Sequence, residues 1–296
     1  MVEVTTTVRD VAGVSIGHTT HTPPRTGCTV IVFDEPALTA AEVRGAAPGT
    51  RELDLLAPGA TVQRADAILL TGGSAFGLRA ADGVMTSLAT MGRGFPTPAI
   101  PVPIVPAAVI FDLANVQPEI PTADDGALAL RTAAPLSEVE TGQVGVGTGA
   151  TWGKIRGPEG TRPGGFAPAQ VAVLGGTVTA AVVVNAFGVV MPADDPRPFA
   201  IDAIGTAPPF GQNTTLMVVI TDVACGHDAL TRMCVAAHDA LARVVWPSHT
   251  VADGDVAFAS TVNAGETDPT TLLPLMMATE LAVEEAIRAA CGMGGR

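Results

Sequence analysis

Residues 211–219 read Gly-Gln-Asn-Thr-Thr-Leu-Met-Val-Val, and within them a polar loop changes abruptly into an apolar strand. The segment before the junction, 192–212, contains five prolines and three aspartates but little apolar periodicity, which is typical of a surface loop. The segment after it, 215–221, is a short apolar run that predicts a buried strand. A loop that leads directly into a rigid strand is an accessible place for a chain break, although composition alone fits an ordinary long loop.

The rest of the chain supplies more strands and three helices. Short apolar runs broken by Gly, Pro or Asp predict further buried strands at 29–33, 67–70, 177–184 and 256–260. Apolar residues recur with helical spacing over 75–91, 227–245 and 271–290. The last of these segments is apolar around most of its circumference, so we expect it to be buried. The irregular alternation of strands and helices predicts an α/β protein in which helices cover stacked sheets.

Composition argues against several classes of protein. A net charge of −13 over 296 residues disfavours nucleic-acid partners, since phosphate binding needs a basic face. No run of about 18 uninterrupted apolar residues occurs, so we expect no membrane-spanning segment, and residues 1–4 show no secretory signal. The cysteines lack CxxC spacing, which is typical of buried thiols in a cytoplasmic protein: Cys28, Cys225, Cys234 and Cys291.

The bond between Asn213 and Thr214 has the residues needed to create an N-terminal nucleophile by self-cleavage. Such chemistry requires Ser, Thr or Cys directly after the bond that breaks, because this side chain attacks the preceding carbonyl and forms an ester that water hydrolyses. The freed α-amine has a pKa of about 8, so a fair fraction is neutral near pH 7 and can act as base for its own hydroxyl. Asn-Thr-Thr also fits a plain turn-to-strand junction, so this stretch alone leaves both interpretations open.

A second group of polar residues lies in the stretch His-Thr-Val-Ala-Asp-Gly-Asp at 249–255, directly before the predicted strand at 256–260. Asp253 and Asp255 are two residues apart and point the same way if the strand already begins there. Paired carboxylates can hold an ammonium group and orient a hydroxyl, whereas Asp-Gly is also a strong β-turn signal. With His249 they would make a partial metal-ligand set, but no second cluster completes it, so we expect no metal.

Lys154 and Asn185 are two further candidates. Lys154 ends the glycine-rich segment 145–154, which is not a phosphate-binding loop because Ile155 rather than Ser or Thr follows the lysine. No regular helix pattern follows, which argues against a dinucleotide-binding fingerprint, so we expect the glycines to allow tight packing that carries Lys154 into a site. Asn185 closes the predicted strand 177–184, where its amide could stabilise an oxyanion or simply bond to a loop. The five histidines form no spaced set with a serine and an acid, which argues against a Ser-His-Asp triad.

These candidates stand in one order along the chain, and four more stretches accompany them: 11–18 (Val-Ala-Gly-Val-Ser-Ile-Gly-His), 48–52 (Pro-Gly-Thr-Arg-Glu), 70–78 (Leu-Thr-Gly-Gly-Ser-Ala-Phe-Gly-Leu) and 105–113 (Val-Pro-Ala-Ala-Val-Ile-Phe-Asp-Leu). Together they resemble the autoprocessing aminopeptidases of the D-aminopeptidase–esterase and β-aminopeptidase group, with their nylon-oligomer hydrolase branch. The resemblance extends over nearly the whole chain. It implies an αββα sandwich. It also implies a single hydrolase domain of residues 1–296 that splits into chains 1–213 and 214–296.

The same resemblance implies roles for the candidate residues. Thr214 would be the nucleophile, Asn185 would serve the oxyanion, and Lys154 would line the site. Asp253 and Asp255 would hold the new α-amine and tune its proton, with no cofactor and no metal. The two chains would stay together, and several processed protomers would assemble as a homo-oligomer.

One position departs from the pattern of these relatives. A Thr nucleophile with two aspartates looks more like the nylon-oligomer branch than like the aminopeptidases, which commonly have Ser and a Ser-Gly-acid. That branch has a Tyr where this chain has Phe111, and no Tyr occurs anywhere in the sequence. A hydroxyl that could bond a substrate is therefore missing. Phe111 itself either contacts substrate or packs in the core, since it lies in an apolar run.

We therefore expect a cytoplasmic amide hydrolase that acts on short amino-acid or ω-amino-acid oligomers of the 6-aminohexanoate type. Three alternatives stay open: an aminopeptidase for α- or β-amino-acid peptides, amides and esters; an acyltransferase of the ornithine acetyltransferase type; and a non-enzymatic binding protein with a lapsed site. The expected partners are a small-molecule or short-peptide amide substrate and the chain's own cleaved fragment, with neither nucleic acid nor membrane.

Overall fold

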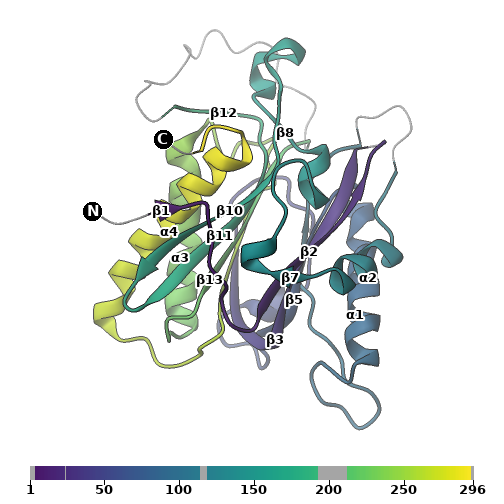
Figure 1. Ribbon diagram of the computed structural model, residues 1–296, viewed down its shortest axis with the longest axis vertical. Coiled ribbons are helices and arrows are strands. Elements are labelled where there is room, and N and C mark those ends of the chain that lie inside the picture. Colours follow the sequence, from purple (N-terminus) through teal and green to yellow (C-terminus); the bar gives the residue numbers. More distant parts are fainter. Residues whose placement is uncertain (1–3, 24, 114–118, 193–211, 295–296) are drawn as a thin grey trace.

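The computed structural model describes residues 4–23, 25–113, 119–192 and 212–294, and its organising element is the long strand β3 (Thr26–Val43) (Figure 1). The first part of β3 pairs antiparallel with β5 (Arg64–Thr71), and its last part pairs antiparallel with β15 (Val256–Thr261). The register shifts between Val32 and Ala37, and an irregularity of this kind bends a strand. The strand β3 therefore belongs to both halves of one folded sheet.

This sheet has 11 strands in the order β1-β10-β11-β13-β15-β3-β5-β6-β4, with β2 paired to β3 and β7 paired to β2. Neighbouring strands are antiparallel except for two parallel pairs, β13 with β15 and β5 with β6. The remaining strands of the sheet are β1 (Val4–Thr5), β2 (Val14–His21), β4 (Thr50–Arg51), β6 (Ala107–Val109), β7 (Ala134–Pro135), β10 (Phe166–Val173), β11 (Gly176–Asn185) and β13 (Thr214–Thr221). Two small sheets pair β8 (Thr151–Trp152) with β9 (Arg162–Pro163), and β12 (Val189–Val190) with β14 (Val245–Trp246).

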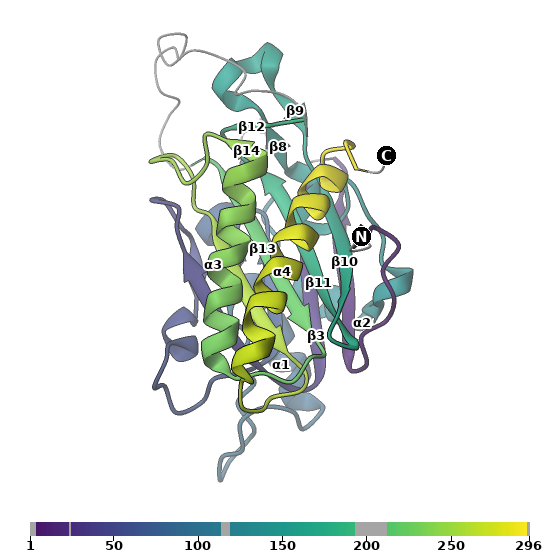
Figure 2. The same cartoon turned by 90° about the vertical axis from the view of Figure 1, so that its left-hand side faces the viewer.

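Helices cover the outer faces of the folded sheet. Figure 2 shows α3 (His227–Val244) and α4 (Pro269–Ala290) side by side over the half that contains β10, β11 and β13. The helices α1 (Ala80–Thr90) and α2 (Ala123–Arg131) pack on the half that contains β2, β3 and β5. Short 3-10 segments connect the elements: η1 (Leu53–Leu56), η2 (Ser74–Arg79), η3 (Leu136–Glu138), η4 (Gly145–Gly149), η5 (Lys154–Arg156) and η6 (Pro158–Gly160).

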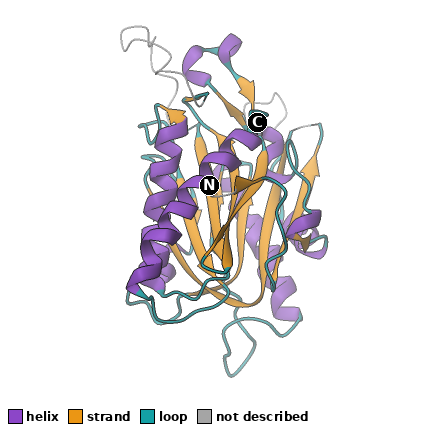
Figure 3. Cartoon of the chain, turned by 60° about the vertical axis from the view of Figure 1, so that its left-hand side comes forward, coloured by secondary structure: helices purple, strands orange, loops and turns teal. Residues whose placement is uncertain are grey.

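Three hydrophobic cores separate four layers, in the order helix, sheet, sheet, helix (Figure 3). Strand β13 shows why its sequence is a continuous apolar run. Leu216 and Val218 face the core between the two sheet halves, while Met217 and Val219 face the core under α3 and α4. Both faces of the strand are thus removed from water, so both sets of alternate residues must be apolar. The α/β expectation, with helices covering stacked sheets, is confirmed.

The five strands and three helices expected from periodicity are all present, with longer strands than the apolar runs alone indicate. The helix expected at 75–91 begins as the 3-10 segment η2, and β2, β10 and α2 were not predicted. The expectation that 271–290 is a buried helix was wrong. Only the side of α4 that faces the sheet and α3 is covered, so that Leu273 and Met277 are 64% and 53% exposed. The loop predicted at 192–212 lies, apart from its two end residues, outside the described residues. Within the described ranges, every helix is too short or too polar to cross a membrane.

Candidate active site

Three strands bring the candidate residues to one edge of the sheet. Strand β11 ends at Asn185, which pairs with Thr214, the first residue of β13. Because β15 runs parallel to β13, the segment that leads into β15 lies beside the same edge, and Asp253 forms a bridge with Asn213. Segments from two separate parts of the sequence thus flank the Asn213–Thr214 bond, one on each side.

The hydroxyl of Thr214 is buried beside the carbonyl group that it would attack. The side chain donates a short hydrogen bond to the carbonyl oxygen of Asn213, and Thr214 is only 4% exposed. The peptide nitrogen of Gly254 donates to the same carbonyl oxygen at 2.8 Å. A side-chain hydroxyl and a main-chain N–H therefore both meet the carbonyl of this one peptide bond.

Only glycine fits at position 254. A Cβ atom there would lie 2.5 Å from the carbonyl oxygen of Ala47 and 2.9 Å from the hydroxyl oxygen of Thr214. The segment after β3 closes on this turn, since the nitrogen of Ala47 donates to the carbonyl of Asp253 at 2.9 Å and that of Arg44 donates to the carbonyl of Asp255 at 3.0 Å. The Asp-Gly-Asp turn is thus fixed on two sides by main-chain hydrogen bonds.

Asp253 is a buried carboxylate with donors on both oxygens. One oxygen accepts the peptide N–H of Phe187 at 3.1 Å, and the other accepts the N–H of Thr250 at 3.1 Å and the Thr250 hydroxyl. Burial, followed by the nearby charge of Asp255, raises the pKa of the Asp253 carboxyl above its usual value. A carboxyl group with a raised pKa can exchange a proton closer to neutral pH than an exposed aspartate can.

Asp255 bonds to a different set of partners. Its Oδ1 accepts the peptide N–H of Thr215, the residue after the candidate nucleophile, at 2.7 Å. Its Oδ2 accepts both the peptide N–H of His249 at 3.1 Å and the ring Nδ1 of His249 at 2.8 Å. Strand β15 starts only at Val256, so the two carboxylates are not consecutive same-side positions of a strand, as the spacing had suggested. They approach the start of β13 with separate partners instead.

Asn185 has an amide whose orientation is fixed by its neighbours. Its Oδ1 accepts the ammonium group of Lys154 at 2.7 Å and the peptide N–H of Thr151 at 3.1 Å. Its Nδ2 donates to the carbonyl oxygen of Phe111 at 3.3 Å. A primary amide nitrogen carries two hydrogens, so one N–H is available in addition to the bond with Phe111. This N–H is a candidate donor to a negatively charged oxygen.

The glycine-rich segment carries Lys154 to Asn185, where its Nζ also donates to the Asn185 carbonyl at 3.2 Å. Gly153 adopts a left-handed conformation with φ of 77° directly before Lys154, and its nitrogen donates to the carbonyl of Gly188 at 2.8 Å. Burial lowers the pKa of Lys154 to about 7, an effect that the charge of Asp253 partly offsets. Lys154 can therefore gain or lose a proton near neutral pH.

Phe111 approaches from the other half of the folded sheet. It follows β6, its side chain is half-buried, and its carbonyl oxygen accepts the Asn185 amide. The neighbouring carboxylate of Asp112, which sequence reasoning missed, accepts the hydroxyl of Thr26 and the N–H of Gly73, each at 2.7 Å. Burial raises the pKa of Asp112. Asp112 thus ties the Phe111 segment to the ends of β3 and β5.

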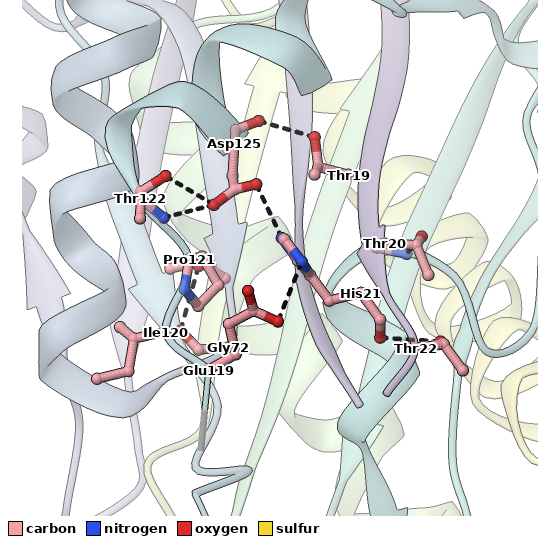
Figure 4. Close-up of polar contacts among 12 residues, drawn as sticks. Thr19, Thr20, His21, Thr22, Gly72, Glu119, Ile120, Pro121, Thr122 and Asp125 are labelled. Carbon is pink, nitrogen blue, oxygen red and sulfur yellow. Dashed lines mark hydrogen bonds and ion pairs between the residues drawn. The ribbon is translucent and has the colours of Figure 1, made fainter. Parts of the chain in front are cut away.

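A second polar cluster lies at the end of β2 (Figure 4). The ring of His21 sits between two carboxylates, with Nε2 2.8 Å from Asp125 and Nδ1 3.4 Å from Glu119. Asp125 also accepts the N–H and hydroxyl of Thr122 at the start of α2. This cluster cross-links β2 to the start of α2. In the described part of the chain, no three His, Cys, Asp or Glu side chains are arranged to bind a metal.

Comparison with known proteins finds a family and relatives that match most of this chain. The pattern of Peptidase family S58 matches residues 6–294. An uncharacterised aminopeptidase of Mycobacterium bovis is 38% identical over 96% of this chain and 89% of its own. A 6-aminohexanoate-oligomer endohydrolase of a Kocuria species is 30% identical over 86% of this chain and 74% of its own.

Two solved structures share the fold. A β-aminopeptidase of a Burkholderia species superposes with a TM-score of 0.76, at 23% identity over 96% of this chain and 86% of that one. The L-aminopeptidase D-Ala-esterase/amidase of Ochrobactrum anthropi, described as a variant of the Ntn hydrolase fold, gives a TM-score of 0.75 at 19% identity over 96% and 85%. The resemblance noted from the sequence is confirmed.

Proposed function

The chain belongs to peptidase family S58, and we propose that it is an amide hydrolase that cleaves itself between Asn213 and Thr214 and then uses Thr214 as its N-terminal nucleophile. One observation carries this proposal above the others. The carbonyl of Asn213 meets the hydroxyl of Thr214 and the peptide N–H of Gly254 at the same time. Main-chain donors aimed at a carbonyl oxygen stabilise the negative charge that it acquires during attack.

In the self-cleavage step, the Thr214 oxygen attacks the carbonyl carbon of Asn213, and the hydroxyl proton passes to the nitrogen of Thr214 as the C–N bond breaks. The product is an ester between Asn213 and the Thr214 side chain, with a free α-amine. Water then hydrolyses the ester, leaving a carboxylate on Asn213 and restoring the hydroxyl of Thr214. During attack, the Gly254 N–H stabilises the oxyanion on the Asn213 carbonyl.

In substrate hydrolysis, the α-amine of Thr214 takes the proton of the hydroxyl as the latter attacks an amide carbonyl. The second N–H of the Asn185 amide stabilises the substrate oxyanion, a role supported by the pairing of Asn185 with Thr214. The proton passes on to the leaving amine, and water hydrolyses the resulting ester. Lys154, with a pKa of about 7, and Asp253 supply the groups that adjust protons around the amine.

The two products of self-cleavage stay associated. Strand β13, which follows the cut, is paired on one side with β11 and on the other with β15, and all of its residues are buried. This pairing supports the proposal that chains 1–213 and 214–296 share one sheet and form a single domain.

The substrates we propose are short oligomers of amino acids or ω-amino acids of the 6-aminohexanoate type. The 6-aminohexanoate-oligomer endohydrolase of Kocuria supports the ω-amino-acid class. A second candidate, hydrolysis of α- or β-amino-acid peptides, is supported by the higher identity to the aminopeptidase of M. bovis. Turnover of a linear 6-aminohexanoate oligomer, an alanine amide and a short β-peptide, measured on one preparation, ranks these classes.

An intact-mass spectrum tests the mechanism itself. We expect the purified protein to contain chains 1–213 and 214–296, and N-terminal sequencing of the small chain to begin Thr-Thr-Leu. Thr214→Ala should remain one chain and lose turnover, because the same oxygen serves both reactions. Thr214→Ser, the matched control, should retain part of each activity. A single uncut chain with full amidase activity would overturn the proposal.

A further inference from the structure

His249, considered from the sequence only as part of an incomplete metal-ligand set, is bonded to the candidate site through Asp255. It donates from its peptide nitrogen and from its ring Nδ1 to the same oxygen of Asp255, at 3.1 and 2.8 Å. The other oxygen of Asp255 accepts the N–H of Thr215. Asp255 therefore connects the imidazole to the residue that follows Thr214, and a displacement of His249 would be transmitted to the start of β13.

The backbone at His249 is held in an unusual conformation. Its φ is 52°, in the left-handed region, which residues other than glycine adopt rarely. Such a conformation is unfavourable unless the surroundings stabilise it, and it is concentrated at functional sites. Here the left-handed turn lets one residue present its backbone N–H and its ring to a single carboxylate oxygen. The two hydrogen bonds to Asp255 are the local compensation.

Both ring nitrogens of His249 face acceptors. Nδ1 lies 2.8 Å from the Asp255 carboxylate, and Nε2 lies 3.4 Å from the carbonyl oxygen of His238. A neutral imidazole can donate from one nitrogen only, whereas the imidazolium donates from both. The ring is only partly covered, with 22% of its side chain exposed, so it can exchange protons with solvent.

The charges around His249 favour the imidazolium form. Burial of the ring lowers its pKa, but the hydrogen bond and charge of Asp255, the His238 carbonyl and the charge of Asp253 outweigh burial, so that the net shift is upward. The neighbouring ring of His238, 4.9 Å away, has its pKa lowered to about 4 by burial and is neutral at pH 7. The charge of Arg44 also acts on His238, and Arg44 forms an ion pair with Glu42 at 2.5 Å.

We propose that His249 is a positioning residue, an imidazolium that compensates the charge of Asp255 and fixes this carboxylate on the N–H of Thr215. Asp253 and Asp255 are each 1% exposed and two residues apart, and two buried carboxylates disfavour each other's charge. With His249 as its partner, Asp255 acts as a clamp on β13, and Asp253 is the carboxylate whose charge acts on Lys154. This inference rests on the proposed function, because it assigns the two aspartates different tasks around the N-terminal Thr214.

Two substitutions separate position from charge. His249→Leu removes the ring donors and the charge, and we expect kcat to fall about 10- to 100-fold, the equivalent of one hydrogen bond to a charged group. His249→Asn keeps a side-chain donor and tolerates the left-handed backbone, but it cannot ionise. We expect this variant to recover more than half of the lost kcat on a logarithmic scale at neutral pH.

The dependence of kcat on pH is the decisive measurement. In the unmodified enzyme kcat should decline as pH rises through the ionisation of His249, and in His249→Asn this decline should be absent. His21→Asn is the matched control, since His21 is also half-buried and bonded to carboxylates, Asp125 and Glu119, but lies in the separate cluster of Figure 4. It should keep the profile of the unmodified enzyme.

Intact mass measured on every variant distinguishes the two proposals. If the unmodified protein stays uncut and fully active, the proposed N-terminal nucleophile is ruled out, whatever the His249 variants do. If the His249 variants are processed and keep an unchanged kcat and pH profile, only the proposed role of His249 is ruled out. If His249→Leu does not fold, His249→Asn decides alone, and an alkaline decline identical to that of the unmodified enzyme overturns the proposal.

Discussion

The peptide N–H of Gly254 donates a 2.8 Å hydrogen bond to the carbonyl oxygen of Asn213. This donor comes from the β15 side of β13, whereas the amide of Asn185 comes from the β11 side. Two donors thus approach the start of β13 from opposite neighbours. In the proposed mechanism each serves one reaction, Gly254 the self-cleavage and Asn185 the later hydrolysis of substrate, and the two reactions should be separable by mutation.

Asn185→Ala should impair substrate hydrolysis without preventing self-cleavage. Loss of the amide removes the oxyanion donor for substrate, and removal of one such donor typically lowers kcat by about 10²–10³-fold. The Asn213 carbonyl retains its bond from Gly254, so chains 1–213 and 214–296 should still form. Intact mass and kcat on the same sample check this expectation. A variant that remains uncut would assign Asn185 to self-cleavage as well.

Gly254→Ala tests the donor assigned to self-cleavage. Its Cβ would press on the Ala47 carbonyl and the Thr214 hydroxyl, shifting the N–H away from Asn213 and slowing self-cleavage. Gly265→Ala is a suitable control, because among the described residues a Cβ there would have only one neighbour within 4 Å, a side-chain carbon of Ala224 at 3.8 Å. The fraction of cut chain over time after synthesis is the measurement. Equal cleavage rates for the two variants would show that the close approach at Gly254 is not needed.

Replacing Asp253 or Asp255 by Asn should lower turnover by roughly 10²-fold or more, the scale of a positioned acid–base group. We expect activity to survive exhaustive dialysis against EDTA. The four carboxylate oxygens already accept N–H or O–H donors from Phe187, Thr250, Thr215 and His249, a bonding pattern suited to protons rather than to a cation. Loss of activity in EDTA with recovery on adding Zn²⁺ or Mn²⁺ would replace this assignment by a metal site.

The buried ammonium of Lys154 should make stability depend on pH. Its pKa falls from an ordinary 10.5 to about 7 on folding, so between these values the unfolded chain binds more protons, and the free energy of unfolding rises with pH. Lys154→Met lacks this contribution. Its stability relative to the parent should be highest below pH 7 and should decline as pH rises toward 10.5. Denaturant unfolding of the parent and of Lys154→Met, both in an uncut Thr214→Ala background, measures the difference in stability. A difference that does not change with pH would contradict the lowered pKa.

Phe111→Tyr tests the missing hydroxyl. In a sealed core an unpaired hydroxyl would destabilise by about 1–3 kcal/mol. Phe111 is only half-buried, and its carbonyl lies 3.3 Å from the Asn185 amide, so we expect the new hydroxyl to change kcat with little change in Tm. Both quantities are measured on one variant. A fall in Tm of several degrees with unchanged kcat would place Phe111 in the core.

The parts of the fold that the sequence predicted are those in which local pattern and burial agree. Strands β11 and β13 are buried on both faces and read as continuous apolar runs, and α3 begins at His227, as its periodicity indicated. Strand β10 was missed because Pro168 interrupts it. The structure tolerates this proline because β1 pairs with β10 only at Gln170 and Val171, which leaves the position of Pro168 unpaired on that side.

Helix α2 was missed for a comparable reason. It contains Gly126, which disfavours a helix but is packed against α1 so closely that a Cβ would lie 2.0 Å from the Ala80 carbonyl. In the candidate site, Thr214, Asn185 and the two aspartates each end or begin an apolar run and so could be selected from sequence. The contact of His249 with Asp255 could not be predicted, because it depends on a left-handed backbone conformation that is uncommon for histidine.

If the chain is cut as proposed, the central position of β13 in the sheet has a consequence for the thermodynamics of the enzyme. Before the cut, folding is unimolecular, and β13 inserts between β11 and β15 as part of one continuous chain. After the cut, complete unfolding also releases an 83-residue fragment (214–296), so refolding becomes a bimolecular association whose midpoint depends on protein concentration. The proposed maturation would therefore convert a unimolecular folding equilibrium into an assembly that dilution opposes, and the precursor would be the form in which this topology is most readily reached.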